Sequence, residues 1–169
     1  MAFKDQVITN PVTGETIRFI ETAAKSGGNL LKFHLTLAPG SKVPMKHIHT
    51  EQDEVFEVLT GCVNIETGSR QVMLMPGEKA VMPKGIAHRW WNNSETESTL
   101  YVSFTPAANT EDFFVEMFAL ASAGRTKPNG APSFMQAVRM CGKYNIYHPW
   151  IPVFVQRSIS NLFNLFGKS

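Results

Sequence analysis

Short apolar segments fill the first 105 or so residues of the chain, and turn-forming residues separate them. Gly, Pro, Asn and Ser recur between these segments every eight to twelve residues or so, a spacing typical of sandwiches and barrels. Nine strands are predicted, at residues 15–21, 30–37, 43–49, 55–59, 62–66, 71–75, 79–82, 88–92 and 99–104. Since no helical period lies between them, the pattern leaves no room for a βαβ unit and predicts an all-β domain.

Beyond Pro106 the apolar residues recur at helical spacing instead. We expect Thr110 to cap a first helix that Gly124 ends, a second helix over 133–143, and a third that begins near Pro152. The third helix is expected to carry its apolar residues on one face, namely Val155, Ile159, Leu162, Phe163 and Phe166, and its polar residues largely opposite, namely Gln156, Asn161 and Asn164. The chain is therefore divided into a barrel, residues 1–108, and a helical extension, residues 109–169.

Composition narrows the class of protein further. With 169 residues, the chain is long enough to bury roughly 70% of its unfolded surface, so it needs no disulfide staples. Hydrophobic residues make up 43% of the chain, which excludes collagen-like and disordered proteins. Charged residues make up only 18%, a low fraction that favours a surface partly covered by a partner, a second copy or a membrane.

Sequence features also suggest a compartment. The chain holds only two cysteines, Cys62 and Cys141, and it does not start with a basic region followed by an apolar run. These features predict a cytoplasmic protein with free thiols. An integral membrane protein is not expected, because no apolar run reaches the eighteen or so residues that a spanning helix needs.

The candidate chemistry lies in three histidines and one glutamate. Alternate side chains of a strand share a face, so His47 and His49 can point at one place. Glu54 follows after an odd number of residues, which is explained if the polar run before it is a turn; His88 comes much later. Three imidazoles and a carboxylate suit one divalent Fe, Mn, Co, Ni, Cu or Zn ion, with positions left for water or substrate. Each of these residues alone has a plainer interpretation, as a hydrogen-bonded histidine or a solvated carboxylate. We interpret His34, which has no matching partner, as such a hydrogen-bonded histidine.

A frame of glycine and proline surrounds these residues. Gly40 precedes the histidine pair and Gly61 follows Glu54, and a second block holds Gly77, Pro83, Gly85, His88 and Asn92. At these positions the sequence resembles the cupin superfamily, although six residues separate Gly40 from His47 where the family usually has five. The resemblance implies a double-stranded β-helix, the jelly-roll barrel, in which His47, His49, Glu54 and His88 converge on one metal. It also implies that the glycines, Pro83 and Asn92 hold turns.

The strand period indicates what surrounds the metal. If His47, His49, Glu54 and His88 face inward, the same parity turns an apolar set inward, namely Met45, Phe56, Val58 and Trp90. Such a lining favours an apolar or aromatic small molecule that carries an oxygen for the metal. Plain core packing is the alternative explanation for Met45, Phe56 and Trp90.

Several reactions fit these residues, because a fold does not determine chemistry. A redox-active metal favours a dioxygenase-like oxidoreductase acting on an enol or a phenol, with Glu54 as an additional catalytic base. A Lewis-acid metal would suit an isomerase or a decarboxylase instead. A third alternative is a cupin without catalysis that binds or senses a small molecule. We prefer the dioxygenase-like enzyme because all four ligands are present beside an apolar lining.

Charge is distributed unevenly between the two parts. Residues 117–169 contain six Lys or Arg and no Asp or Glu, whereas the first 116 residues contain ten basic and fourteen acidic side chains. The net charge of +2 is therefore a charge of +6 on residues 117–169 offset by a charge of −4 on the first 116 residues. We expect the extension to pack on the barrel or on a second subunit, and the chain to form a homodimer. Peripheral membrane contact by the last helix is a less favoured alternative, and nucleic-acid binding is not expected because the basic residues are spread out.

Overall fold

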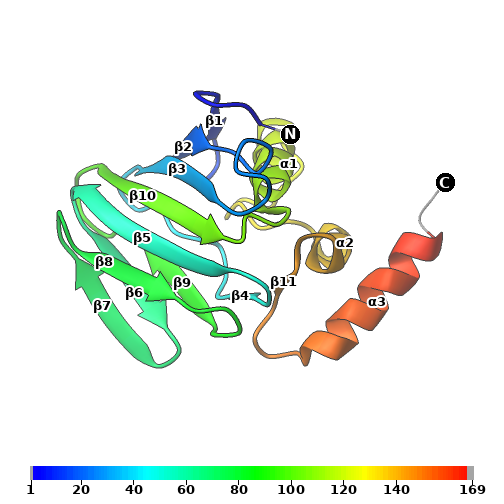
Figure 1. Ribbon diagram of the computed structural model, residues 1–169. Coiled ribbons are helices and arrows are strands. Elements are labelled where there is room, and N and C mark those ends of the chain that lie inside the picture. Colours follow the sequence, from blue (N-terminus) through cyan, green and yellow to red (C-terminus); the bar gives the residue numbers. More distant parts are fainter. Residues whose placement is uncertain (1, 167–169) are drawn as a thin grey trace.

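Two antiparallel sheets enclose the core and give the chain a jelly-roll fold (Figure 1). The computed structural model describes residues 2–166, with side chains described for residues 2–163. The first sheet has the order β1 (Val7–Asn10), β2 (Glu15–Glu21), β3 (Leu31–Leu37), β10 (Ser98–Thr105), β5 (Asp53–Thr60) and β8 (Lys79–Met82). The second has the order β7 (Arg70–Leu74), β6 (Val63–Thr67) and β9 (His88–Trp91). A short pair, β4 (Ile48–His49) and β11 (Ile146–Tyr147), forms a third sheet.

Alternation of side chains explains why these segments are strands. Every second residue of β3, from Leu31 to Leu37, is buried, and the residues between are half-buried. Strand β10 pairs with β3 and buries the same alternate positions, so both strands direct one face into the core. The turn between β5 and β6 needs glycine, since Gly61 has a φ of +74° and an added Cβ would lie 2.7 Å from the Glu97 carbonyl oxygen.

The predicted strands are confirmed to within one or two residues, with one correction. Only Ile48–His49 of the predicted strand 43–49 is a strand. Isolated bridges pair Lys42 with Trp91 and His47 with His88, so two extra residues lie on one side of this ladder. Pro44 lies within this bulge and has no N–H to donate, which explains the interruption. Strands β1 and β11 were not predicted.

The three predicted helices are present as α1 (Thr110–Ser122), α2 (Phe134–Tyr144) and α3 (Val153–Phe166). Ser133 caps α2 through a reciprocal capping box with Gln136. The expected cap at Thr110 is wrong: Asn109 is the N-cap residue and makes no side-chain capping bond. The Thr110 hydroxyl is instead engaged by the side-chain amide of Gln52.

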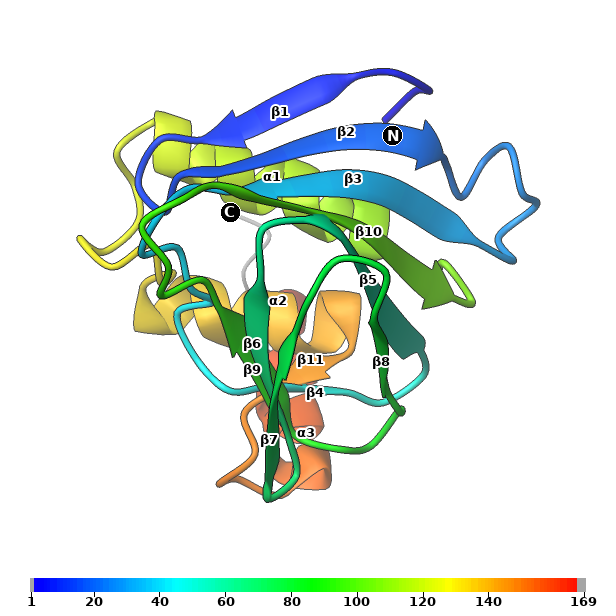
Figure 2. The same cartoon turned by 90° about the vertical axis from the view of Figure 1, so that its left-hand side faces the viewer.

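The helical extension lies at one end of the barrel, beside β4 and β11 (Figure 1), and behind the sheets when the barrel faces the viewer (Figure 2). Side chains of α1 and α2 belong to the same apolar core as the strands, among them Met117, Phe118 and Met140. Strand β11 also belongs to the extension, and it pairs with β4. Among the described residues, no helix is long and apolar enough to cross a membrane.

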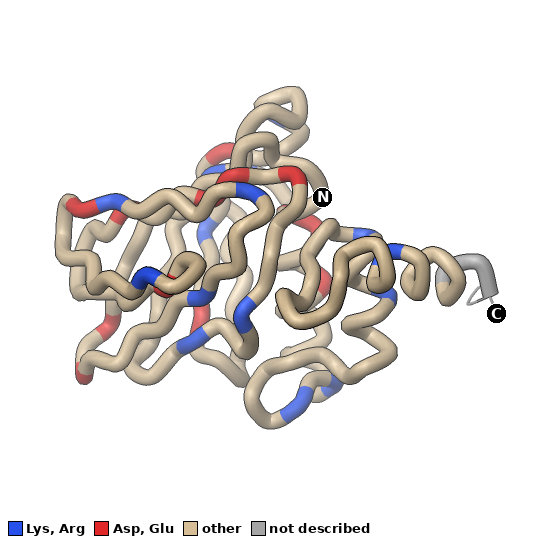
Figure 3. The backbone as a smooth tube through the Cα atoms, turned by 90° about the horizontal axis from the view of Figure 1, so that it is seen from below, with Lys and Arg blue, Asp and Glu red and all other residues tan. Residues whose placement is uncertain are grey.

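Helix α3 leaves much of its expected apolar face exposed within one chain, since Ile159 is 41% exposed while Val155 and Phe163 are half-buried. Its polar residues Gln156 and Ser160 are buried, whereas Phe154 is 73% and Leu162 is 55% exposed. Gln156 hydrogen-bonds to the main chain of the turn before the helix, and Ser160 accepts a bond from the Gly142 N–H of α2, so these contacts decide which face lies inward. The side chains of Asn164 and Phe166 lie outside the described residues. In Figure 3, α2 and α3 carry basic and no acidic positions. The homodimer stays a prediction.

Candidate metal centre

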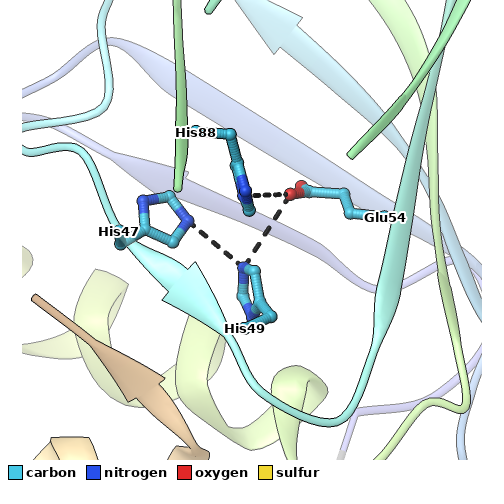
Figure 4. Close-up of side chains that lie close together, drawn as sticks. All are labelled: His47, His49, Glu54 and His88. Carbon is cyan, nitrogen blue, oxygen red and sulfur yellow. Dashed lines mark hydrogen bonds and ion pairs between the residues drawn. The ribbon is translucent and has the colours of Figure 1, made fainter. Parts of the chain in front are cut away.

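Three separate segments bring the four predicted side chains together (Figure 4). His49 belongs to β4, Glu54 is the second residue of β5 and His88 is the first of β9. The main chains of His47 and His88 bond to each other twice, at 3.0 and 2.9 Å, which places their rings side by side. One ligand atom from each of the four residues lies within 4.8 Å of all the others.

Main-chain carbonyls orient two of the imidazole rings. His47 Nδ1 lies 3.2 Å from the Met45 carbonyl oxygen, and His88 Nδ1 lies 2.9 Å from the Ile86 carbonyl oxygen. A carbonyl only accepts, so each Nδ1 carries the hydrogen, and each Nε2 is left with a lone pair. This is the arrangement in which a histidine binds a metal through Nε2.

Gln52 supports the third ring, although the sequence analysis placed this residue only in a polar turn. Its side chain is fully buried, and Nε2 donates to the Ala107 carbonyl oxygen at 2.8 Å and to the Thr110 hydroxyl. Its Oε1 and the His49 Nδ1 atom are both buried and have no other partner, and donation of a hydrogen bond from the His49 ring to Gln52 acts to raise the pKa of His49. Gln52 thus joins the start of α1 to a candidate ligand.

Burial sets the charge of the cluster. It lowers the pKa of His47 to about 3 and the pKa of His49 well below its usual range, with the neighbouring imidazoles adding to the effect. Burial also acts to lower the pKa of His88, but the Glu54 carboxylate 3.0 Å away outweighs it and raises that pKa. His47 and His49 are therefore neutral at pH 7, as metal ligands must be.

Unpaired polar atoms indicate that a cation fits between these residues. Glu54 Oε2 and His88 Nε2 lie 3.0 Å apart, yet both are buried and neither makes an aligned hydrogen bond. Buried polar atoms without partners are rare in native proteins, and each one calls for an explanation. One transition-metal ion would satisfy both atoms together with the nitrogens of His47 and His49, and imidazole with carboxylate is a donor set that such ions accept.

A cavity of about 600 Å³ adjoins this cluster. The barrel and the extension both supply its largely apolar walls, which include Phe104, Phe113, Phe114, Met117, Met140 and Ile146. Of the predicted pocket residues, Met45 and Trp90 line the cavity. Phe56 and Val58 share the inward face of β5 with Glu54, but they lie further along the strand, in the core and away from the cavity.

Glu15 is a further cavity residue that the sequence analysis did not identify. It is the first residue of β2, lines the cavity, and is only 8% exposed. Burial raises its pKa to about 7, and a hydrogen bond from Thr13, which acts to lower this pKa, offsets only part of the effect. The sequence carried one relevant signal, an acidic residue at an inward position of a predicted strand.

The raised pKa predicts a pH dependence of stability. Between its unfolded pKa of 4.5 and its folded pKa of about 7, Glu15 binds its proton more tightly in the folded protein, so the free energy of unfolding falls as pH rises through this range. The total loss is on the order of 3 kcal/mol. Glu15→Gln removes this titration. In urea unfolding, the free energy of unfolding of the variant should therefore rise relative to that of the wild type between pH 4 and pH 8. A constant difference between the two across this range would contradict the prediction.

Comparison with known proteins agrees with the fold. The family model for the cupin domain matches residues 33–104. Germin-like protein 3-3 of Oryza sativa is 28% identical over 151 residues, which are 83% of this chain and 64% of the relative. Oxalate oxidase 1 of Hordeum vulgare is 25% identical over 143 residues, which are 78% of this chain and 69% of the relative.

A solved structure extends the likeness to three dimensions. An RmlC-like cupin from Shewanella frigidimarina superposes with a TM-score of 0.53 at 20% identity, covering 67% of this chain and 94% of that one. At this identity the likeness concerns the fold alone. The chain spans less than two thirds of the length of the germin-like relatives that it matches, 64% or 61% in each.

Proposed function

We propose that this chain, whose residues 33–104 form a cupin domain, is a metal-dependent enzyme acting on a small molecule. It would be a dioxygenase-like oxidoreductase for an apolar or aromatic substrate that carries an oxygen. One observation carries the proposal: a buried cluster of three imidazoles and one carboxylate lies beside a large, mostly apolar cavity. When bound, a redox-active divalent metal would supply Lewis acidity toward the substrate oxygen and electrons for reaction with O2.

The chain's own residues supply the rest of the chemistry. His47, His49, Glu54 and His88 would hold the ion, with two rings fixed by main-chain carbonyls. The aromatic walls exclude water and orient the substrate. We propose that the Glu54 carboxylate also accepts the enol or phenol proton of the substrate, because Glu54 lines the cavity in which the substrate would bind.

Oxalate, the compound in the name of the barley relative, fits this cavity poorly. It is a small dianion; the metal would compensate part of its charge, and the cavity would have to supply positive groups for the rest. Of the residues that line this cavity, Lys127 is the only Lys or Arg, and its side chain is exposed. A larger and less polar substrate therefore agrees better with the walls.

Oxygen consumption tests the proposal. Metal-free protein would be reconstituted separately with Fe(II), Mn(II), Ni(II) and Zn(II), and O2 uptake would be measured against a panel of phenols and enols. We expect uptake with at least one redox-active ion and none with Zn(II), and we expect Glu54→Gln to lower it by at least about tenfold, as for the loss of a general base.

Other outcomes would replace the proposal. Tight binding of panel compounds without any O2 uptake would favour a binding or sensing cupin. Conversion without O2 uptake, supported by Zn(II) as well, would favour an isomerase or a decarboxylase. Failure of every ion to bind would overturn the metal centre itself.

A further inference from the structure

Glu15 belongs to a well-ordered turn at the wall of the cavity. Asn10 Oδ1 accepts hydrogen bonds from the N–H groups of Val12 and Thr13, at 3.0 and 3.2 Å, and so closes the turn between β1 and β2. The Thr13 hydroxyl donates to Glu15 Oε2 at 2.7 Å, and Ser41 Oγ donates to the Thr13 carbonyl oxygen at 2.8 Å. The position of the carboxyl group is therefore set by several contacts.

The other carboxyl oxygen, Oε1, has no hydrogen-bond partner among the described residues. Over the described residues, Thr13 is the one side chain that hydrogen-bonds to the Glu15 carboxyl group, and no Lys, Arg or His forms an ion pair with it. A carboxyl group that is buried with a single neutral hydrogen bond is costly. A hydrogen-bond donor brought by a ligand into the cavity would offset this cost at Oε1.

Glu15 and the metal cluster lie apart on the same cavity. Strands β3 and β10 separate β2 from β5 by about 14 Å across the sheet. Glu15 is in register with Ser98 of β10 and Glu54 with Phe104, six residues further along the same strand. The cavity between them is walled by apolar side chains, including Val43, Trp90 and Phe104. Glu15 and the metal cluster line the same cavity. A ligand in it would therefore meet polar groups at two separate points and apolar side chains between them.

We propose that Glu15 is a second recognition point for the ligand, which is an elongated molecule with an oxygen donor for the metal at one end, an apolar middle, and an amine or hydroxyl donor for Glu15 at the other. This inference rests on the proposed function, because it takes the metal cluster as the first anchor. It adds a requirement that the metal site alone does not impose: the substrate carries a second polar group at a distance from the reacting one.

Two probes that differ only at one end test the assignment. Octanoate and 8-aminooctanoate share a carboxylate for the metal and an apolar chain, and only the second carries a donor for Glu15. Binding of each to the Mn(II)-loaded protein would be measured by calorimetry at pH 8, where Glu15 is ionised. We expect 8-aminooctanoate to bind at least about tenfold more tightly, as for a hydrogen bond to a charged group.

Variants test whether the Glu15 carboxylate, and not another part of the cavity, causes the difference in affinity. Glu15→Gln keeps the size of the side chain, and we expect it to bring the ratio of the two affinities close to one without changing the affinity for octanoate. Glu15→Leu serves as a second variant if the glutamine disturbs the turn, and thermal unfolding checks that each folds. Lys127→Met, which alters an exposed lysine at the same cavity, should leave the ratio unchanged.

The outcomes distinguish the two proposals. Metal content is measured first and tests the proposed function. If the protein takes up no Mn(II), the metal centre is overturned, and with it the first contact that the inference assumes. If the metal and octanoate both bind but the amine confers no gain on the wild type, the role of Glu15 is overturned while the metal centre stands. The role of Glu15 is also overturned if both Glu15 variants still bind 8-aminooctanoate more tightly than octanoate.

Discussion

Replacing His88 with glutamine will lower the bound metal from about one ion per chain to less than about a tenth. The change removes the Nε2 atom that lies 3.0 Å from Glu54 Oε2, and it leaves three ligands of the four. Loss of a residue that merely supports a ligand already costs about 10–100-fold in affinity, so loss of a ligand costs at least as much. Equilibrium dialysis followed by elemental analysis measures the ratio of metal to protein.

His34 offers a matched control for this experiment. Its ring lies on Tyr101 with the ring centres 4.5 Å apart, on the face of β3 that points away from the core. His34→Gln makes the same chemical change at a histidine outside the cluster, and its metal content should equal that of the wild type. Full metal loading of His88→Gln, or equal losses in the two variants, would show that the cluster is not the binding site.

Replacing Phe104 with alanine will cost about 3–5 kcal/mol of stability, the range for a large aromatic side chain removed from a core. Phe104 is 1% exposed and packs against three different elements. Its ring lies 6.2 Å from that of Phe33 in β3, 6.1 Å from that of Phe114 in α1 and 5.3 Å from that of His49 in β4. The substitution therefore loosens the barrel, the extension and the metal cluster together.

Thermal unfolding of metal-free protein measures the effect of this substitution. For a chain of this size each kcal/mol corresponds to about 2–4 °C, so we expect the Tm of Phe104→Ala to fall by about 10 °C. Phe154→Ala is the control, since that side chain in α3 is 73% exposed and its removal should change stability by less than about 0.5 kcal/mol. Similar losses in both variants would mean that Phe104 does not join these elements.

Local geometry located only part of the cluster from sequence, and His88 was joined to it through the resemblance of its glycine and proline frame to the cupin superfamily. His47 and His49 share a face through the two-residue period of an extended chain, and the polar residues before Glu54 form a bend that restores its orientation. The strands of the barrel were predictable for the same reason: β3 and β10 bury every second residue along their length.

Contacts between distant segments could not be predicted in this way. Gln52 meets Ala107 and Thr110 only after the chain has folded, and no period in the sequence relates these residues. Glu15 reaches the cavity because the β1–β2 turn is held by Ser41, which is equally distant in sequence. Such residues differ from ordinary polar residues only in what surrounds them, which is a property of the fold.

The packing of α3 depends on polar residues that its amphipathic pattern did not single out. The pattern places apolar residues on one side, and burying that side is the usual outcome. Here Gln156 makes bonds at 2.8 and 2.9 Å to the main chain at His148, and Ser160 contacts Gly142, where the absence of a side chain lets α2 and α3 approach. These polar contacts therefore hold α3 against α2 and the preceding turn, while Ile159 and Leu162 of the apolar face stay exposed within one chain.

The pairing of β11 with β4 has a consequence for any shortened form of the protein. Ile146 and Tyr147 cover the outer side of the strand that carries His49. A chain ending before β11 would leave Ile48 and His49 as an exposed sheet edge, and such edges act as templates for pairing between molecules. We therefore expect a chain that ends before β11 to aggregate more readily than the whole chain.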